Sequence, residues 1–117
     1  MRFVIQEHDA SHHHFDFRLE VNGILKSWAV PKGVPLTSGI KHLAVPTPDH
    51  DMDWVDFEGK IPKGLYGAGM VKIWDTGTYE LVNIKVDNMK IELKGNKCNG
   101  VYVLHLMDNK DWLIFKI

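Results

Sequence analysis

Histidine, aspartate and arginine side chains are concentrated near the N-terminus, between residues 8 and 18. If the chain forms a strand from His14 onward, its side chains alternate between two faces, so His14, Asp16 and Arg18 share one face. An imidazole and a carboxylate at alternate positions can bind a metal ion together. The planar guanidinium of arginine can hold a phosphate or a carboxylate through two parallel hydrogen bonds. The spacing therefore predicts a metal or anion site on this face.

His8 is a further candidate ligand, six residues before His14. We predict a first strand over residues 1–6, and the polar residues 9–11 could break it and return the His8 imidazole to the same site. The triple histidine at 12–14 could instead be the remnant of an affinity tag. A tag rarely continues into an alternating Phe-Asp-Phe-Arg-Leu run, so we take His8, His14 and Asp16 as candidate metal ligands.

His50 stands apart from this stretch, in the acid-rich segment 49–59, which we expect to be a loop. A loop histidine between aspartates is more often solvated than catalytic. His50 joins the site only if the fold returns it to the face of His14 and Asp16. Lys32, at the start of a loop rich in proline and glycine, could also reach an anion.

A hairpin must position this site, because Asn22-Gly23 lies between two apolar runs and is a strong signal for a type I′ turn. A two-residue turn fixes the register of the two strands. It places apolar residues opposite one another on one face and small residues opposite the polar site on the other. The expected pairs are Phe15 with Val30, Phe17 with Trp28, Asp16 with Ala29, and Arg18 with Ser27.

The rest of the sequence has the regular short strands and Gly/Asn/Asp turns of an all-β protein. We expect a short strand at 42–45 ended by Pro46 and Pro48, and a hairpin connection rich in glycine at 60–69 that is not a phosphate-binding loop. Further strands are expected at 70–74, 78–83, 88–94, 101–107 and 112–117, with a turn at 75–77. The predicted fold is a single compact antiparallel β-barrel with little helix, forming one domain over residues 1–117.

The composition excludes several classes of protein. The 117 residues are 44% hydrophobic and 25% charged, which is typical of a globular domain. A formal net charge of −1 argues against coating of duplex nucleic acid, and the single Cys98 excludes an internal disulfide or a zinc knuckle. No apolar run is long enough for a membrane span and no export leader is present, so we expect a cytoplasmic monomer.

The candidate ligands suit Mn²⁺, Fe²⁺ or Zn²⁺ and leave positions open for water and substrate. One interpretation is a metal-dependent phosphoesterase in which Arg18 holds a phosphate oxygen. Another is a non-haem iron oxygenase, because His-x-Asp followed by a distant histidine is typical of its metal site. A non-catalytic β-barrel that binds nucleic acid is the third, although it leaves the face of His14, Asp16 and Arg18 unexplained. The proximity of Arg18 to Asp16 favours phosphate.

At these residues the chain resembles the 3′-phosphoesterase domain attached to the bacterial ATP-dependent DNA ligase D of non-homologous end joining. The resemblance covers nearly the whole chain, and several blocks occur in the same order. The most specific blocks are residues 3–8, His14-Phe-Asp-Phe-Arg-Leu-Glu20, residues 23–33, 49–50 and 57–62, Tyr66-Gly-Ala-Gly69 and residues 112–116.

The resemblance implies a β-barrel enzyme that uses Mn²⁺, with Zn²⁺ or Co²⁺ as ions that could occupy the same site. It implies removal of a 3′-terminal ribonucleotide and then of the 3′-phosphate from DNA or RNA–DNA primer-template ends, together with a DNA ligase and end-joining proteins acting in trans. His8, His14 and Asp16 match the metal ligands of the family, and Arg18 and His50 match its contacts to the scissile phosphate.

Three further residues are expected near the substrate by the same resemblance. Lys32 matches a lysine of the family motif. Trp54 occupies a position where the family often has a tyrosine, so the hydroxyl contact is lost and only the aromatic wall remains. His42 occupies a position where the family usually has an arginine, so the charge there depends on pH. The chain begins almost at the first core strand, without the N-terminal arm of the family.

Overall fold

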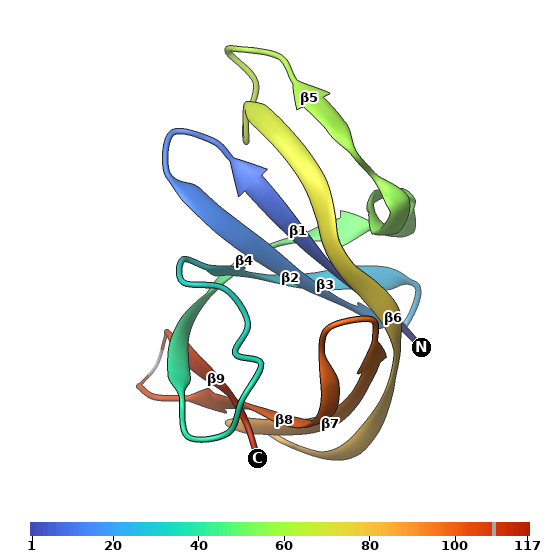
Figure 1. The fold of residues 1–117 in the computed structure, drawn as a ribbon, viewed down its shortest axis with the longest axis vertical. Helices are drawn as coiled ribbons and strands as arrows, with labels where there is room; N and C mark the ends of the chain where they lie inside the picture. Colours follow the sequence, from blue (N-terminus) through green and yellow to red (C-terminus); the bar gives the residue numbers. More distant parts are fainter. Residues whose placement is uncertain (109) are drawn as a thin grey trace.

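The computed structural model describes residues 1–108 and 110–117. These residues form nine β-strands and one short 3₁₀ helix, with no α-helix among them (Figure 1). The elements are β1 (Arg2–Asp9), β2 (His13–Val21), β3 (Ile24–Val30), β4 (Lys41–Asp51), η1 (Met52–Asp56), β5 (Gly59–Ile61), β6 (Gly69–Lys85), β7 (Asn88–Gly95), β8 (Asn99–Leu106) and β9 (Trp112–Lys116). Within the described ranges, no helix is long and apolar enough to span a membrane.

Antiparallel pairing closes the sheet into a barrel. The strands follow the order β1-β2-β3-β4-β9-β8-β7-β6, and a pairing between β1 and β6 joins the two ends. The short strand β5 pairs with the first residues of β6, outside this closed ring. Figure 1 shows β1, β2 and the beginning of β6 extending above the ring toward β5. The prediction of an all-β antiparallel barrel is confirmed.

The β2–β3 hairpin has the predicted turn and register. Asn22 and Gly23 both have positive φ, at 52° and 83°, as a type I′ turn requires. All four predicted cross-strand pairs occur, including Arg18 with Ser27 and Asp16 with Ala29. The local turn chemistry is therefore sufficient to place the polar residues of β2 on one face.

Strand β4 is longer than predicted, because it continues through Pro46 and Pro48 to Asp51. Beyond Ala44, which pairs with β9, β4 has only β3 as a described neighbour. Proline is tolerated where the N–H would point away from a neighbouring strand, so neither proline needs to end β4. His50 consequently lies on a strand, opposite Leu25, and the prediction that it lies in a loop is wrong.

Strand β6 is also continuous, and the turn predicted at 75–77 does not exist. The buried Asp75 carboxylate accepts hydrogen bonds from the backbone N–H groups of residues 76 and 96–98. Gly77 pairs with Gly95, and a Cβ built on Gly77 would lie 2.0 Å from the carbonyl oxygen of Lys94. Gly77 is therefore needed for a close approach of two strands, not for a turn.

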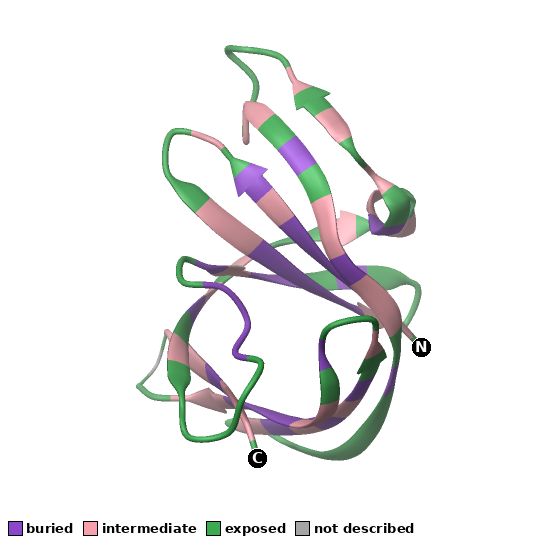
Figure 2. Cartoon of the chain, viewed as in Figure 1, coloured by how far each residue is buried: buried purple, intermediate pink, exposed green. Residues whose placement is uncertain are grey.

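The core fills the barrel and leaves the polar residues of β2 on the outer face of the sheet. Buried side chains in the barrel include Phe3, Phe17, Trp28, Leu93 and Tyr102. A smaller buried cluster of Val4, Leu25 and Val55 lies between this outer face and η1. Figure 2 shows the buried residues on β1, β2 and β3, with the connection between β5 and β6 exposed. Strand alternation thus separates the core from the candidate site.

Candidate active site

Three of the predicted residues form one compact cluster. His8 on β1 lies directly opposite His14 on β2, and their ring centroids are 4.8 Å apart. Asp16 follows on the same face of β2. One possible ligand atom from each residue lies within 4.8 Å of the others. His8, His14 and Asp16 therefore form a possible metal site, in agreement with the alternation in the sequence.

Backbone carbonyl groups fix the tautomers of both histidines. His8 Nε2 donates to the carbonyl oxygen of Gly67 at 2.6 Å, and His14 Nδ1 donates to the carbonyl oxygen of His12 at 2.9 Å. A carbonyl oxygen can only accept, so these nitrogens carry hydrogen. In each neutral imidazole the other nitrogen therefore has a lone pair. Outer-shell hydrogen bonds of this kind orient histidine ligands in metal sites.

Both lone pairs face the same carboxylate. His8 Nδ1 lies 3.1 Å from one oxygen of Asp16, and His14 Nε2 lies 3.2 Å from the other. Asp16 is only 5% exposed, so water cannot easily separate these groups. Facing lone pairs repel unless protons or a cation lie among them. The arrangement fits a divalent cation bound by two imidazole nitrogens and a carboxylate oxygen.

The protonation of the cluster responds to the same contacts. The hydrogen bond with Asp16 raises the pKa of His14, although burial opposes this shift. Burial acts to raise the pKa of Asp16, but the hydrogen bond with His14 and the positive charge of Arg18 outweigh it and lower that pKa. Without a metal, the cluster therefore favours a proton on His14 and a charged Asp16.

Arg18 is 4% exposed and is held beside the cluster by neutral groups. Its Nε donates to the Gln6 side-chain oxygen at 2.7 Å, and one terminal nitrogen donates to the Ser27 hydroxyl at 2.8 Å. The other terminal nitrogen lies 3.5 Å from an Asp16 oxygen, beyond the length of a strong charge-assisted hydrogen bond. Arg18 is thus positioned, and its charge is only partly compensated by Asp16.

Gln6 and Ser27 were not predicted as site residues, yet they set the position of Arg18. The Gln6 amide donates to the carbonyl oxygens of Trp54 and Phe57, at 2.8 and 3.1 Å, so its oxygen is turned toward Arg18. The Ser27 hydroxyl donates to the carbonyl oxygen of Leu25 at 3.2 Å. Gln6 is two residues before His8, so strand alternation could have placed it on the same face.

His50 does reach this face, from β4. Its Nδ1 lies 3.1 Å from Arg18 and 2.8 Å from the carbonyl oxygen of Pro48. Nδ1 accepts from Arg18 in one tautomer and donates to Pro48 in the other, since one nitrogen cannot do both. Burial lowers the pKa of His50, and the charge of Arg18 lowers it further. His50 is therefore neutral near pH 7.

Trp54 completes one wall of the site. It packs edge-on against His50, with ring centroids 5.1 Å apart, and the Arg18 guanidinium carbon lies 5.8 Å from its ring centre. A cavity of about 430 Å³ opens over the cluster. Its lining includes the three candidate ligands, Arg18, His50 and Trp54. The volume is in the range of small-molecule sites and can admit a nucleotide end.

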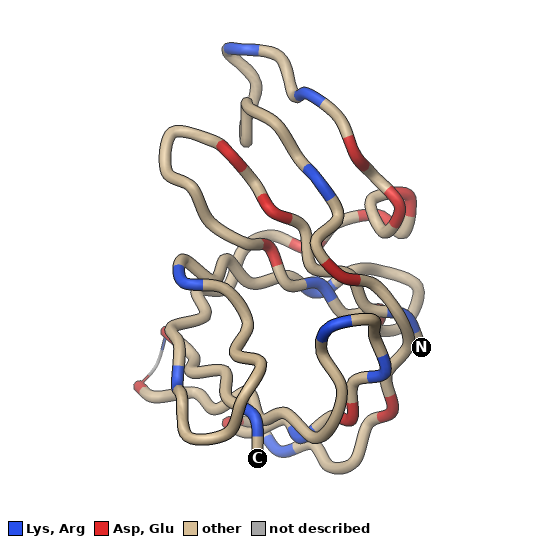
Figure 3. Tube along the Cα trace, in the orientation of Figure 1, with Lys and Arg blue, Asp and Glu red and all other residues tan. Residues whose placement is uncertain are grey.

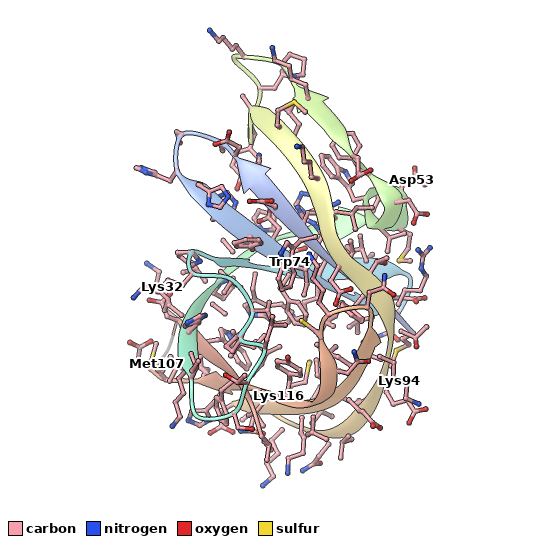
Figure 4. All side chains as sticks on the ribbon, in the orientation of Figure 1. Lys32, Asp53, Trp74, Lys94, Met107 and Lys116 are labelled. Carbon is pink, nitrogen blue, oxygen red and sulfur yellow. The ribbon has the colours of Figure 1, made fainter. Side chains whose placement is uncertain are left out.

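Lys32 and His42 are not brought to this cavity. Lys32 is exposed between β3 and β4, and Figure 4 shows it at the outer edge of the molecule. His42 Nδ1 donates to the carbonyl oxygen of Gly33 at 2.5 Å, and neither residue lines the cavity. Their contacts with substrate stay predictions.

Sequence reasoning also missed Thr47, Tyr66 and Gly67, which line the cavity. Thr47 lies on β4, opposite Ser27. The sequence predicts that this strand ends before Thr47, at Pro46. Tyr66 and Gly67 belong to the connection between β5 and β6, and Gly67 meets His8 across 59 positions of sequence. No local pattern reports such a contact. The sequence predicts residues 60–69 only as a glycine-rich hairpin connection and as a block of the resemblance, with no role in the site.

The fold and the site together define an antiparallel β-barrel that has a candidate metal centre next to a buried arginine. Comparison with known families assigns it more narrowly. The family described as the DNA Ligase D 3′-phosphoesterase domain matches residues 6–106. The chain belongs to this family, as the motifs of the sequence indicated.

Several multifunctional non-homologous end joining proteins named LigD are similar to this chain. The protein of Mycobacterium tuberculosis strain H37Rv is 44% identical over 119 residues, covering 98% of this chain and 16% of the relative. That of Pseudomonas aeruginosa is 47% identical over 105 residues, covering 86% of this chain and 12% of the relative. That of Mycolicibacterium smegmatis is 43% identical over 127 residues, covering 99% and 17%. The chain thus spans between about an eighth and about a sixth of the length of these relatives.

Proposed function

We propose that residues 1–117 act as one metal-dependent phosphoesterase domain that heals 3′ ends. The substrate is a 3′-phosphate on a DNA or RNA–DNA primer-template, and the product is a 3′-OH that a ligase can join. The proposal includes removal of a 3′-terminal ribonucleotide as a second activity. Family membership supports the reaction class. The observation that carries it is the pair of imidazole nitrogens, one from His8 and one from His14, that face Asp16 beside the buried Arg18.

We propose Mn²⁺ as the cofactor, held by His8, His14 and Asp16, with Zn²⁺ and Co²⁺ able to occupy the same ligands. Two nitrogens and one carboxylate oxygen suit these borderline and hard ions. A bound ion would polarise the phosphoryl group and stabilise the charge that develops on it.

The protein's own residues would bind and orient the phosphate. Arg18 would hold a phosphate oxygen through its terminal N–H groups, while Gln6 and Ser27 keep the guanidinium in place. In hydrolysis the bond between phosphorus and the 3′ oxygen breaks, water adds to phosphorus, and the 3′ oxygen gains a proton. Neutral His50 can accept a proton from the water, or donate an Nε2–H hydrogen bond to the phosphate. Trp54 would limit the cavity on one side.

The cellular setting is proposed from the names of the relatives, which describe DNA repair by non-homologous end joining. We propose that the domain acts on DNA ends as a monomer in the cytoplasm, together with a DNA ligase and end-joining proteins acting in trans. Lys32, His42 and Trp54 remain proposed contacts to the substrate.

A buried arginine beside the candidate ligands favours a phosphate substrate over an iron oxygenase reaction. A binding module without catalysis would leave the oriented histidines without a role. The test is incubation of the protein with a 3′-phosphate primer-template, with and without Mn²⁺. Metal-dependent release of phosphate with many turnovers supports the proposal. Oxygen uptake with Fe²⁺ and a 2-oxo acid, or binding without release, would contradict it.

A further inference from the structure

The segment from Gly59 to Gly69, here called the β5–β6 arm, borders the cavity and has an unusual composition. It contains Lys60 and Lys63 but no acidic residue. Both lysines are exposed, and neither forms an ion pair with a described residue. In Figure 3 the charged positions of the arm are basic, and an acidic position, Glu58, lies directly before it. Within the arm this is the charge pattern expected of a surface that contacts phosphates.

Tyr66 lies at the end of the arm and is 81% exposed, although it lines the same cavity as His8 and Asp16. No described aromatic residue packs against its ring. An exposed tyrosine at the mouth of a site leaves its apolar ring faces in water. Such a ring is available to stack on a flat, apolar ligand surface such as a nucleobase.

The arm is nevertheless held in place. The backbone N–H of Leu65 donates to the carbonyl oxygen of Pro62, and that of Ala68 donates to the carbonyl oxygen of Leu65, at 3.3 and 3.1 Å. Gly67, next to Tyr66, accepts the hydrogen bond of His8. The backbone of Tyr66 is therefore constrained on both sides relative to the candidate metal site.

Strand pairing places Lys60 on the face opposite the cavity, because Lys60 pairs with Met70, Met70 pairs with Asp9, and directly paired residues share a face. Glu58, directly before the arm, is exposed and accepts a hydrogen bond from the backbone N–H of Ile73.

Glu7 and Asp9 alternate with His8 along β1, so they lie on the other face of the sheet. There they form a groove with His13 and Lys72, separate from the cavity. The face that carries the candidate metal site thus meets the arm without a nearby exposed carboxylate from β1.

We propose that the β5–β6 arm binds the terminal nucleotides of the 3′ strand in single-stranded form. The terminal base stacks on Tyr66, and Lys63 contacts a backbone phosphate upstream of it. This rests on the proposed function, because it takes the cavity as the place where the 3′ phosphate binds. A nucleic-acid end combines a flat base with negative charge, which matches an exposed ring three residues from an exposed lysine.

The test measures affinity for a single-stranded DNA oligonucleotide with a 3′-OH, which the proposed phosphatase reaction leaves unchanged. Fluorescence anisotropy compares the whole chain with its Tyr66→Ala and Tyr66→Phe variants. We expect Tyr66→Ala to weaken binding about tenfold and Tyr66→Phe to bind within about twofold of the original. On an oligonucleotide whose terminal residue lacks a base, the difference between Tyr66→Ala and the original chain should vanish.

The contact of Lys63 is tested by salt dependence. Lys63→Gln should lower the slope of log affinity against log salt by about 0.7, the value for one phosphate contact on a single strand. Lys85→Gln, an exposed lysine at the end of β6, is the matched control and should leave the slope unchanged.

Two outcomes overturn the inference: Tyr66→Ala binding as tightly as the original chain, or Lys85→Gln lowering the slope as much as Lys63→Gln. These outcomes are separate from failure of the proposed function. A chain that binds the oligonucleotide in the predicted way but releases no phosphate with any of the three ions supports the arm and contradicts the phosphatase. Metal-dependent phosphate release, together with unchanged oligonucleotide binding in all arm variants, supports the phosphatase and contradicts the proposed role of the arm.

Discussion

His8 on β1 donates a hydrogen bond from Nε2 to the carbonyl oxygen of Gly67, 2.6 Å away and 59 positions later in the chain. This bond leaves the Nδ1 lone pair of His8 directed at Asp16. The connection between β5 and β6 therefore contributes to the candidate metal site through its backbone, although none of its side chains belongs to the ligand set.

Gly67→Ala should weaken metal binding. Gly67 has φ +75°, and an added Cβ would lie 3.3 Å from Cε1 of His8, so the substitution strains the backbone and displaces the imidazole. We expect Mn²⁺ affinity, measured by calorimetric titration, to fall by about tenfold to a hundredfold. Gly64→Ala is the control, since it has a similar φ of +87° but nothing within 4 Å of its Cβ. Equal losses in both variants would show that the His8 contact is unimportant.

Arg18→Lys should retain metal binding and lose turnover. Lysine keeps the positive charge but cannot donate to Gln6 and Ser27 at once while also presenting two N–H groups to a phosphate. We expect kcat to fall by about a hundredfold or more, as when a fixed donor to developing charge is removed. Steady-state kinetics with a 3′-phosphate primer-template, alongside Mn²⁺ titration, checks this. A variant with normal kcat would exclude the proposed hydrogen bonds from Arg18 to the phosphate.

The metal-free protein should lose stability as pH rises through the pKa of folded His14. That pKa lies above its ordinary value of 6.5 because of the hydrogen bond with Asp16, so the stabilisation is complete below pH 6.5 and is lost above the raised pKa. Thermal unfolding in a chelator, from about pH 6 to 8, should therefore show a falling Tm. Added Mn²⁺ should oppose the fall, because it replaces the proton.

His14→Asn provides the control for this pH dependence. It removes the titrating imidazole while keeping a polar side chain of similar reach. The fall in Tm should be smaller in this variant, and Mn²⁺ should have less effect on it. An identical pH profile in both proteins would mean that another group causes the change.

Asp75→Ala should destabilise the barrel without touching the site. Asp75 is 2% exposed and accepts hydrogen bonds from the backbone N–H groups of residues 76 and 96–98. Leaving buried donors unpaired should lower the free energy of unfolding by about 3 kcal/mol. Urea unfolding measures the effect. Asp53→Ala, at an exposed position of η1 (Figure 4), should change it by less than about 0.5 kcal/mol.

The parts of the site that were predictable depend on local chemistry. Asn22-Gly23 determines the turn, the turn determines the register, and strand alternation then places Asp16 and Arg18 on one face. His8 was also predictable, because a short polar stretch joins it to the neighbouring strand. In each case the interacting residues are close in sequence.

The parts that were missed depend on pairing between distant strands. Whether Pro46 ends β4 depends on which edge of that strand is covered, and this is a property of the closed barrel. The same error concealed the place of His50 on β4. Gly67 meets His8 only because β6 returns to pair with β1. Asp75 and Gly77 were interpreted as turn residues because their composition is typical of a turn, whereas tertiary contacts decide their role.

The central claim is that His8, His14 and Asp16 hold a metal ion required to remove a 3′-phosphate. The most direct measurement is the initial rate of phosphate release from a 3′-phosphate primer-template as Mn²⁺ is increased, for the original chain and for Asp16→Asn. We predict saturable, Mn²⁺-dependent release by the original chain and at least a hundredfold loss in Asp16→Asn at every Mn²⁺ concentration, on the order of the loss expected for a group that binds the catalytic ion. Equal rates for the two proteins, or release that persists in a chelator, would contradict the account.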